Sequence, residues 1–183
     1  MLKCSPRLIA SALGVALAAA VPLPAEAQAA PAAEAPIVKI WQAPAYHTLA
    51  QAVIDDVWSK WKDEMLGITF HAKPAGMDKY AMIAGTWPDR IGKASAEEDI
   101  ITADEGFIVL DPRYHKADPI PKYLVLIPLR DRNSTNIGTV VFGFKNLAGS
   151  GKSGPDYVAV ATALRDQMQK QIPNAAALYE RAK

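Results

Sequence analysis

One short stretch, GTWPDRIG at residues 85–92, places an aromatic, an acidic and a basic side chain within four residues. In the wall of a pocket, the guanidinium group of Arg90 would bind a ligand carboxylate through two parallel hydrogen bonds, a geometry that lysine cannot reproduce. Trp87 would supply apolar contact to the same ligand. The alternative is that Asp89 and Arg90 form a local ion pair that ties the loop together, while Trp87 fills the core.

A second polar cluster, Tyr114-His115-Lys116, follows Arg113 in a stretch that contains three prolines. The polar ends of these side chains would close over a small anion if the stretch folds over a pocket. The alternative is an exposed turn of polar residues. Two further side chains join the set if the loops fold inward. The candidate ligand-binding residues are Tyr80, Trp87, Asp89, Arg90, Tyr114, His115 and Lys122.

The motifs of the common catalytic and metal sites are missing from the sequence. There is no Gly-x-Ser-x-Gly, no glycine-rich phosphate loop and no His-Glu-x-x-His. The three histidines, His47, His71 and His115, are not spaced for zinc or copper, and nothing supports haem. We therefore expect neither a metal site nor a cofactor, and we expect a protein that is not an enzyme.

The first 29 residues have the features of a secretory signal peptide. Lys3 and Arg7 precede an apolar run from Leu8 to about Val21, and small-x-small cleavage sites follow at residues 25–29. An uncleaved membrane anchor is the alternative, but the run is shorter than the roughly 20 apolar residues that a spanning helix needs. We expect a periplasmic or secreted protein that has no membrane contact after cleavage.

Cysteine content and charge exclude several classes of function. Cys4 is the only cysteine, so the mature chain would have no thiol nucleophile, disulfide, cysteine-ligated zinc or covalently attached haem. The mature chain would also carry 18 basic and 18 acidic residues once Lys3, Arg7 and Glu26 are removed. This balance favours neither nucleic acid nor an anionic membrane surface as a partner.

The length of 183 residues, half of them apolar, suits one domain with a single core. Residues 30–44 are rich in alanine and proline and predict a loosely ordered lead-in, which leaves residues 45–183 as the domain. An amphipathic helix is predicted from Tyr46, with apolar residues every four positions from Leu49 to Met65 and Gly67 as its stop. A second helix is predicted after Ser153 and ends before Pro173, and a short helical piece starts at Asn174.

The clearest β pattern is the stretch KYLVLIPLRDRNSTNIGTVVFGFKN at residues 122–146. Apolar residues occupy both faces of its two strands, which predicts central strands of a covered sheet. Shorter strands are predicted at Ile68–Ala72, Ile100–Ala103 and Gly106–Leu110, the last two joined by a turn at residues 104–105. Residues 77–99 predict a structured loop with one helical turn, and residues 111–122 a second loop. The order favours an α+β fold with a mainly antiparallel sheet.

The same hairpin resembles the last two strands of extracytoplasmic Cache domains, the PAS-like sensor modules. In those strands a Pro-Leu-x-Asp pattern ends the first strand and Ile-Gly opens the second, matched here by Pro128, Leu129, Asp131, Ile137 and Gly138. The resemblance covers most of the mature chain and implies a central antiparallel sheet with a long N-terminal helix and a C-terminal helix. Independently of the resemblance, a curved antiparallel sheet with one face under a helix can hold a small molecule on its other face under mobile loops, here residues 73–99 and 111–122.

We therefore expect a periplasmic, sensor-type Cache module that binds a small polar organic molecule such as a carboxylate. Because no transmembrane helix or signalling domain follows Lys183, such a module would store or carry its ligand, or report it through a protein partner in a sensory or transport system. Two alternatives stay open. One is a secreted enzyme that uses the same cavity with His115 or Asp89 as general base, and the other is a structural or partner-binding protein that has no ligand.

Overall fold

The computed structural model describes residues 37–113, 120–147 and 149–183. The predicted signal peptide at 1–29, with Cys4, and the candidate residues Tyr114 and His115 lie outside these ranges. In chain order the elements are α1 (Leu49–Trp61), β1 (Met65–Ala72), β2 (Ala81–Gly85), the 3₁₀ turn η1 (Pro88–Arg90), α2 (Glu97–Glu105), β3 (Val109–Arg113), β4 (Lys122–Arg130), β5 (Asn136–Lys145), α3 (Gly154–Gln169) and the 3₁₀ turn η2 (Ala176–Tyr179).

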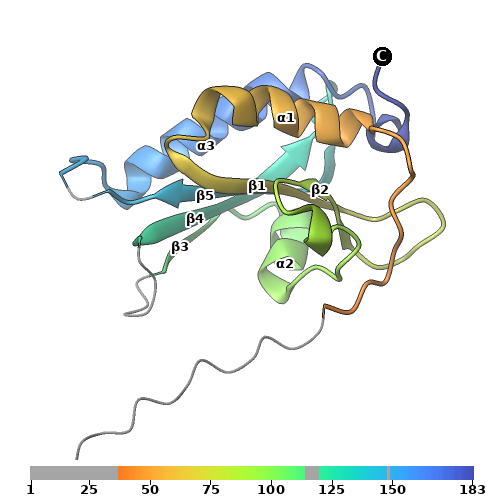
Figure 1. The fold of residues 1–183 in the computed structure, drawn as a ribbon, viewed down its shortest axis with the longest axis horizontal. Helices are drawn as coiled ribbons and strands as arrows, with labels where there is room; N and C mark the ends of the chain where they lie inside the picture. Colours follow the sequence, from red (N-terminus) through yellow and green to blue (C-terminus); the bar gives the residue numbers. More distant parts are fainter. Residues whose placement is uncertain (1–36, 114–119, 148) are drawn as a thin grey trace, which may run out of the picture. The chain divides into compact units, whose positions relative to one another are not determined.

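The five strands form one sheet in the order β2-β1-β5-β4-β3, and every neighbouring pair is antiparallel. Helices α1 and α3 cover one face of this sheet, and the short helix α2 lies against the other (Figure 1). The predicted fold class is therefore confirmed: the protein is α+β, with a central antiparallel sheet, an N-terminal helix and a C-terminal helix. None of the described helices has the length and apolar content needed to cross a bilayer.

The predicted hairpin forms the adjacent strands β4 and β5, which are central to the sheet as expected. Val125, Ile127 and Leu129 point into the core beneath α1 and α3, together with alternate residues of β5. The turn between the strands depends on Asp131, which is 5% exposed. Its Oδ1 accepts hydrogen bonds from the backbone N–H groups of Asn133 and Thr135, each at 2.9 Å. The acid of the Pro-Leu-x-Asp pattern therefore holds the hairpin closed.

Helix α1 begins after Thr48, whose side-chain oxygen accepts a hydrogen bond from the N–H of Gln51 at 3.3 Å. Its apolar side packs on the core as predicted, but the helix ends at Trp61 and Met65 starts β1 instead. The four-residue spacing continues to Met65 because this residue is also buried, as the first residue of a strand. Residues 62–64 form the turn, and the carbonyl of Glu64 accepts the N–H of Lys145 in β5.

The predicted strand Ile100–Ala103 is wrong, because these residues lie in helix α2. Acidic residues fill the first turn of α2, where negative charge stabilises a helix. The N–H of Gly106 bonds to the carbonyl of Thr102, and Gly106 closes the helix in the left-handed conformation with φ +75°. The following strand, β3, starts at Val109 rather than at Gly106 and includes residues 111–113, which were predicted as loop.

The predicted loop at residues 77–99 contains a strand that the sequence analysis missed. Strand β2 pairs with β1 and is followed by η1, the single helical turn that was expected. The segment after η1 folds back along β2: the N–H of Met82 bonds to the carbonyl of Lys93, and the N–H of Gly92 bonds to the carbonyl of Met82. The carbonyl of Gly92 also accepts the N–H groups of Ile40 and Trp41, so this segment covers the β2 edge of the sheet.

The C-terminal part agrees with its prediction. Helix α3 starts after Ser153, whose N–H and hydroxyl both bond to the carboxylate of Asp156, and its apolar stripe packs on the core. Asn174 accepts the N–H of Ala177 at the start of η2. The chain after η2 returns to α1, where the carbonyl of Glu180 accepts the N–H of Leu49.

Candidate ligand-binding site

The outer face of the sheet, defined as the face opposite α1 and α3, carries small and polar side chains as well as aliphatic ones. Because side chains alternate between the two faces of a strand, the outer face takes every second residue of β1, β4 and β5. The residues involved are Gly67, Thr69 and His71 in β1, Leu124 and Leu126 in β4, and Val141 and Gly143 in β5. This composition leaves the outer face less filled than the core face.

Two cavities lie on the outer face, between the strands, the loop that carries η1, and the start of α2. One has a volume of about 170 Å³ and the other about 220 Å³, and both are lined by Trp87, Arg90, Leu124 and Val141. Together these cavities form what we call the outer groove. The first reaches over Thr69 and His71 to Asp99, and the second extends over Gly67 to Lys122.

The ring of Trp87 forms one wall of the outer groove because residue 67 has no side chain. A Cβ atom at Gly67 would lie only 2.6 Å from ring atom Cζ2 and closer still to Cη2. The position of the loop is fixed by Thr86, whose N–H bonds to the carbonyl of Ile68 and whose hydroxyl oxygen accepts the N–H of Ile68. The guanidinium carbon of Arg90 lies 5.8 Å from the centre of the Trp87 ring, a cation–π arrangement.

The walls of the outer groove carry charges of both signs. Arg90 and Lys93 line the smaller cavity, and Arg90 and Lys122 line the larger one, opposite the aliphatic side chains of the sheet. The acidic residues in these walls, Glu98 and Asp99, both come from the first turn of α2. The larger cavity, with an apolar floor and Arg90 and Lys122 as the charged residues of its described lining, suits a small organic anion, while the smaller cavity carries two charges of each sign.

A buried polar cluster around His71 lies at the end of the smaller cavity. His71 Nε2 is 2.9 Å from Thr69 Oγ1, and His71 Nδ1 is 3.2 Å from Asp99 Oδ2 and 2.9 Å from Ser95 Oγ. Thr69, His71 and Asp99 are 6%, 8% and 7% exposed. The same Asp99 oxygen accepts the N–H of Ala96, so the acid that starts α2 also holds the histidine ring.

Burial lowers the pKa of His71 below the ordinary histidine value, because a charged imidazolium is disfavoured away from water. The carboxylate of Asp99 opposes this effect, Lys93 adds to it, and Glu98 opposes it more weakly. The neutral ring is thus the favoured form when the groove holds no anion.

Of the predicted site residues, the structure brings three together: Trp87, Arg90 and Lys122 line the outer groove. Asp89 is exposed on η1 and lines neither cavity. The ion pair between Asp89 and Arg90, which was the alternative to ligand binding, does not appear among the salt bridges of the described residues. Arg90 instead lies over the Trp87 ring.

Tyr80 lies elsewhere, in a hollow of about 390 Å³ on the other side of Ser95. Its hydroxyl donates to Asp104 Oδ1 at 2.6 Å, and the ammonium group of Lys73 lies 4.6 Å from its ring centre. Burial, together with the neighbouring carboxylate of Asp104, raises the pKa of Tyr80 above its ordinary value. Tyr80 is therefore already engaged with side chains of its own chain.

The sequence analysis missed Thr69, His71 and Asp99 as a group. A signal was present in β1, where Gly67, Thr69 and His71 alternate with the apolar residues Ile68 and Phe70. That alternation marks a strand with one face out of the core. The partner Asp99 could not be assigned, because its position depends on α2.

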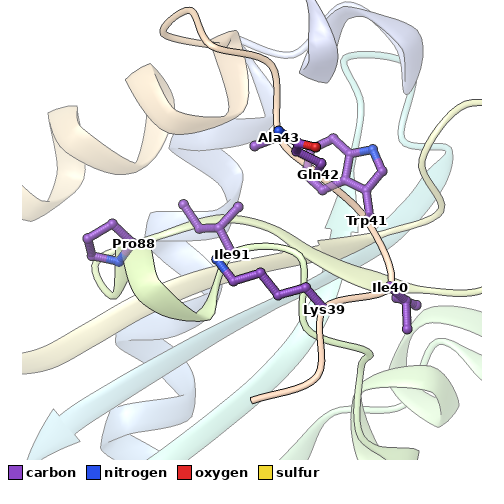
Figure 2. Close-up of a pocket in the computed structure, with 7 residues that line it drawn as sticks. All are labelled: Lys39, Ile40, Trp41, Gln42, Ala43, Pro88 and Ile91. Atoms are coloured by element: carbon purple, nitrogen blue, oxygen red, sulfur yellow. The ribbon is translucent and has the colours of Figure 1, made fainter. Parts of the chain in front are cut away.

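A larger hollow, of about 630 Å³, lies between residues 39–43 and η1 (Figure 2). The segment before α1 forms one side, and Pro88 and Ile91 form the other. Among the described residues that line it, Lys39 is the one that is charged, and Lys39, Gln42 and Pro88 are exposed. This hollow therefore lacks the converging polar groups of a specific site. Within the part of the chain that the structure describes, no three His, Cys, Asp or Glu side chains gather to hold a metal ion.

No protein-family model and no curated protein sequence matches the chain. Solved structures are similar in fold. The periplasmic domain of RsbU from Chlamydia trachomatis is 15% identical, with a TM-score of 0.41 over 64% of this chain and 39% of that chain. The E. coli DcuS sensor domain is 21% identical, with a TM-score of 0.36 over 51% of this chain and 64% of that chain. The GAF domain from Acinetobacter phosphoenolpyruvate-protein phosphotransferase is 13% identical, with a TM-score of 0.46 over 69% of this chain and 83% of that chain.

These similarities concern the arrangement of helices and sheet alone, and each of the three TM-scores is below 0.5. The chain spans less than two thirds of the RsbU and DcuS chains. Nothing about a ligand follows from the similarities, so the function has to be argued from the outer groove.

Proposed function

We propose that the protein is a sensor-type module of the Cache class, periplasmic or secreted, that binds a small organic carboxylate in the outer groove and is not an enzyme. The observation that carries this proposal is the pair of adjoining cavities on the outer face, both walled by Trp87 and Arg90. Arg90 is central because it lines both cavities.

The size of the outer groove limits the ligand. Each cavity, at about 170 and 220 Å³, is smaller than the roughly 300–1,000 Å³ of sites for drug-sized molecules. A carboxylate with a few carbon atoms fits this space, with its apolar part on Leu124 and Val141. Its charged end would face Arg90, whose guanidinium group matches the two oxygens of a carboxylate.

The position of Asp89 gives the enzymatic alternative little support. Asp89 is exposed and lines neither cavity, so it is poorly placed as a general base for a molecule in the outer groove. His115, the other general base of that alternative, lies outside the described residues. Binding without turnover is therefore the function that we propose.

A thermal-shift screen of the purified protein against organic acids and amino acids tests the proposal. A ligand at about 100 times its Kd stabilises the native state by about 2.7 kcal/mol, which would raise the Tm by about 5–10 °C. The shift should disappear in Arg90→Gln. It should shrink in Arg90→Lys, because lysine keeps the charge but cannot form two parallel hydrogen bonds with a carboxylate. Lys62→Gln, which removes an exposed charge at the end of α1, is the matched control. The absence of a shift with every carboxylate, or shifts that survive Arg90→Gln, would contradict the proposal.

A further inference from the structure

We propose that Thr69, His71 and Asp99 form a proton relay at the end of the smaller cavity of the outer groove, through which binding of a carboxylate ligand takes up one proton from solvent. This inference rests on the function proposed above, because the relay needs an anion in the groove. It adds a role for three residues that neither the sequence motif nor the walls of Trp87 and Arg90 explain.

The geometry fixes the hydrogen positions of the relay when His71 is neutral. The Asp99 carboxylate can only accept hydrogen bonds, so the proton of the neutral ring belongs on Nδ1, 3.2 Å from Asp99 Oδ2. Ser95 Oγ, 2.9 Å from the same nitrogen, shares that proton as a second acceptor. Nε2 then carries a lone pair, and the hydroxyl of Thr69 donates to it across 2.9 Å.

In this state Thr69 presents only oxygen lone pairs to the cavity. A carboxylate placed beside Thr69 would meet an acceptor and be repelled. Protonation of His71 reverses the polarity: Nε2–H now donates to Thr69 Oγ1, and the hydroxyl hydrogen is free to turn toward the cavity. Thr69 then donates to an oxygen of the carboxylate, and the one bond formed is Nε2–H, made with the proton taken from solvent.

Charges of both signs surround His71, so a bound anion would raise the pKa of its ring. The charged groups that face the ring lie on η1, on α2 and on the stretch between them, namely Arg90, Lys93, Glu98 and Asp99. The residues paired with His71 on the neighbouring strands, Met82 of β2 and Thr139 of β5, are uncharged. A carboxylate in the smaller cavity would add a negative charge on the open side of the ring, where charges interact strongly because water is partly excluded.

The test uses NMR on the full chain, labelled at histidine. Acetate is the probe, because it is a small molecule that carries a carboxylate next to a methyl group. The His71 signal is assigned by its loss in His71→Gln. We expect the Nδ1–H form of the ring in chloride, and a rise of its pKa by about one pH unit in excess acetate at the same ionic strength. Acetate should accordingly bind about tenfold more tightly below this titration than above it.

Thr69→Val separates a relay from a purely structural cluster, since valine keeps the shape of threonine but has no hydroxyl. The acetate-dependent rise in the His71 pKa should be smaller in Thr69→Val, where the charge of acetate acts on the ring without the hydroxyl, and should return to its full size in Thr69→Ser. If acetate stabilises the protein through Arg90 while the His71 pKa stays fixed, the relay is wrong and the binding function stands. If acetate neither stabilises the protein nor moves the His71 pKa, the relay and the carboxylate assignment both fail.

Discussion

The indole ring of Trp87 lies against the backbone of Gly67, in contact with the sheet where any other residue would place a Cβ atom. The glycine therefore sets how closely the loop with η1 approaches β1, and so the width of the outer groove. Gly143, directly opposite Gly67 on β5, has a different environment. A Cβ there would meet Leu124 Cδ2 at 3.4 Å, an ordinary van der Waals contact.

We predict that Gly67→Ala destabilises the protein by about 1–3 kcal/mol, the usual cost of overpacking, and weakens ligand binding because it displaces Trp87. Gly143→Ala is the matched control and should cost much less. Denaturant unfolding measures the loss of stability in both variants. The double variant Gly67→Ala/Trp87→Ala should lose less than the sum of the single variants, and strict additivity would show that the two residues are not coupled.

Asp131→Ala should destabilise the protein by about 1–3 kcal/mol, because two backbone N–H groups in the β4–β5 turn lose a charged acceptor. Asp131→Asn keeps an oxygen in the same place and should lose less. The free energy of unfolding from urea titration measures the difference. Equal losses in the two variants would mean that the hydrogen bonds of Oδ1 do not hold the hairpin.

Gly106→Ala tests whether α2 is a helix that ends at Gly106. Residue 106 ends the helix with φ +75°, and no atom lies within 4 Å of an added Cβ, so the cost is conformational alone. We expect a loss of about 1 kcal/mol in unfolding free energy, with a smaller loss for Gly106→Asn because asparagine tolerates this conformation. A neutral Gly106→Ala would contradict a helix that ends there.

The stability of the ligand-free protein should fall as the pH drops below about 6.5, the ordinary pKa of histidine. Because burial lowers the pKa of folded His71, the unfolded chain binds a proton more readily in this range, and acid favours unfolding. The contribution of His71 is complete above this range and is lost progressively until the pH reaches the lowered pKa of the folded state.

One such proton changes the free energy of unfolding by at most about 1.4 kcal/mol per pH unit. His71→Gln should remove this pH dependence, as measured by urea unfolding at closely spaced pH values in chloride. A variant whose unfolding free energy follows the same pH profile as the wild-type protein would show that His71 is not the titrating group.

The elements that could be predicted from the sequence are those whose apolar pattern is fixed by the core. Strands β4 and β5 and the two long helices have such patterns, because α1 and α3 pack on one face of the sheet. Helix α2 was mistaken for a strand because isoleucine and threonine favour strands, while its acidic first turn and Gly106 indicated a helix. The acidic first turn and Gly106 therefore outweighed the strand propensity of the isoleucine and threonine residues.

The site was predictable where its residues adjoin in sequence and not where they meet through the fold. Trp87 and Arg90 lie three residues apart on one loop, and both line the outer groove. Thr69 and His71 come next to Asp99 only because α2 packs on the outer face, almost 30 positions further along the chain. No spacing rule connects residues placed in that way.

The edges of the sheet bear on how the protein behaves when it is concentrated. An open edge strand is a template onto which another molecule can add a strand, the first step toward aggregates. At the β2 side, the backbone groups of Met82 are already bonded to Gly92 and Lys93. At the β3 side, the strand is five residues long and contains Pro112, which has no N–H to offer. Both ends of the sheet thus resist the growth of intermolecular β-structure.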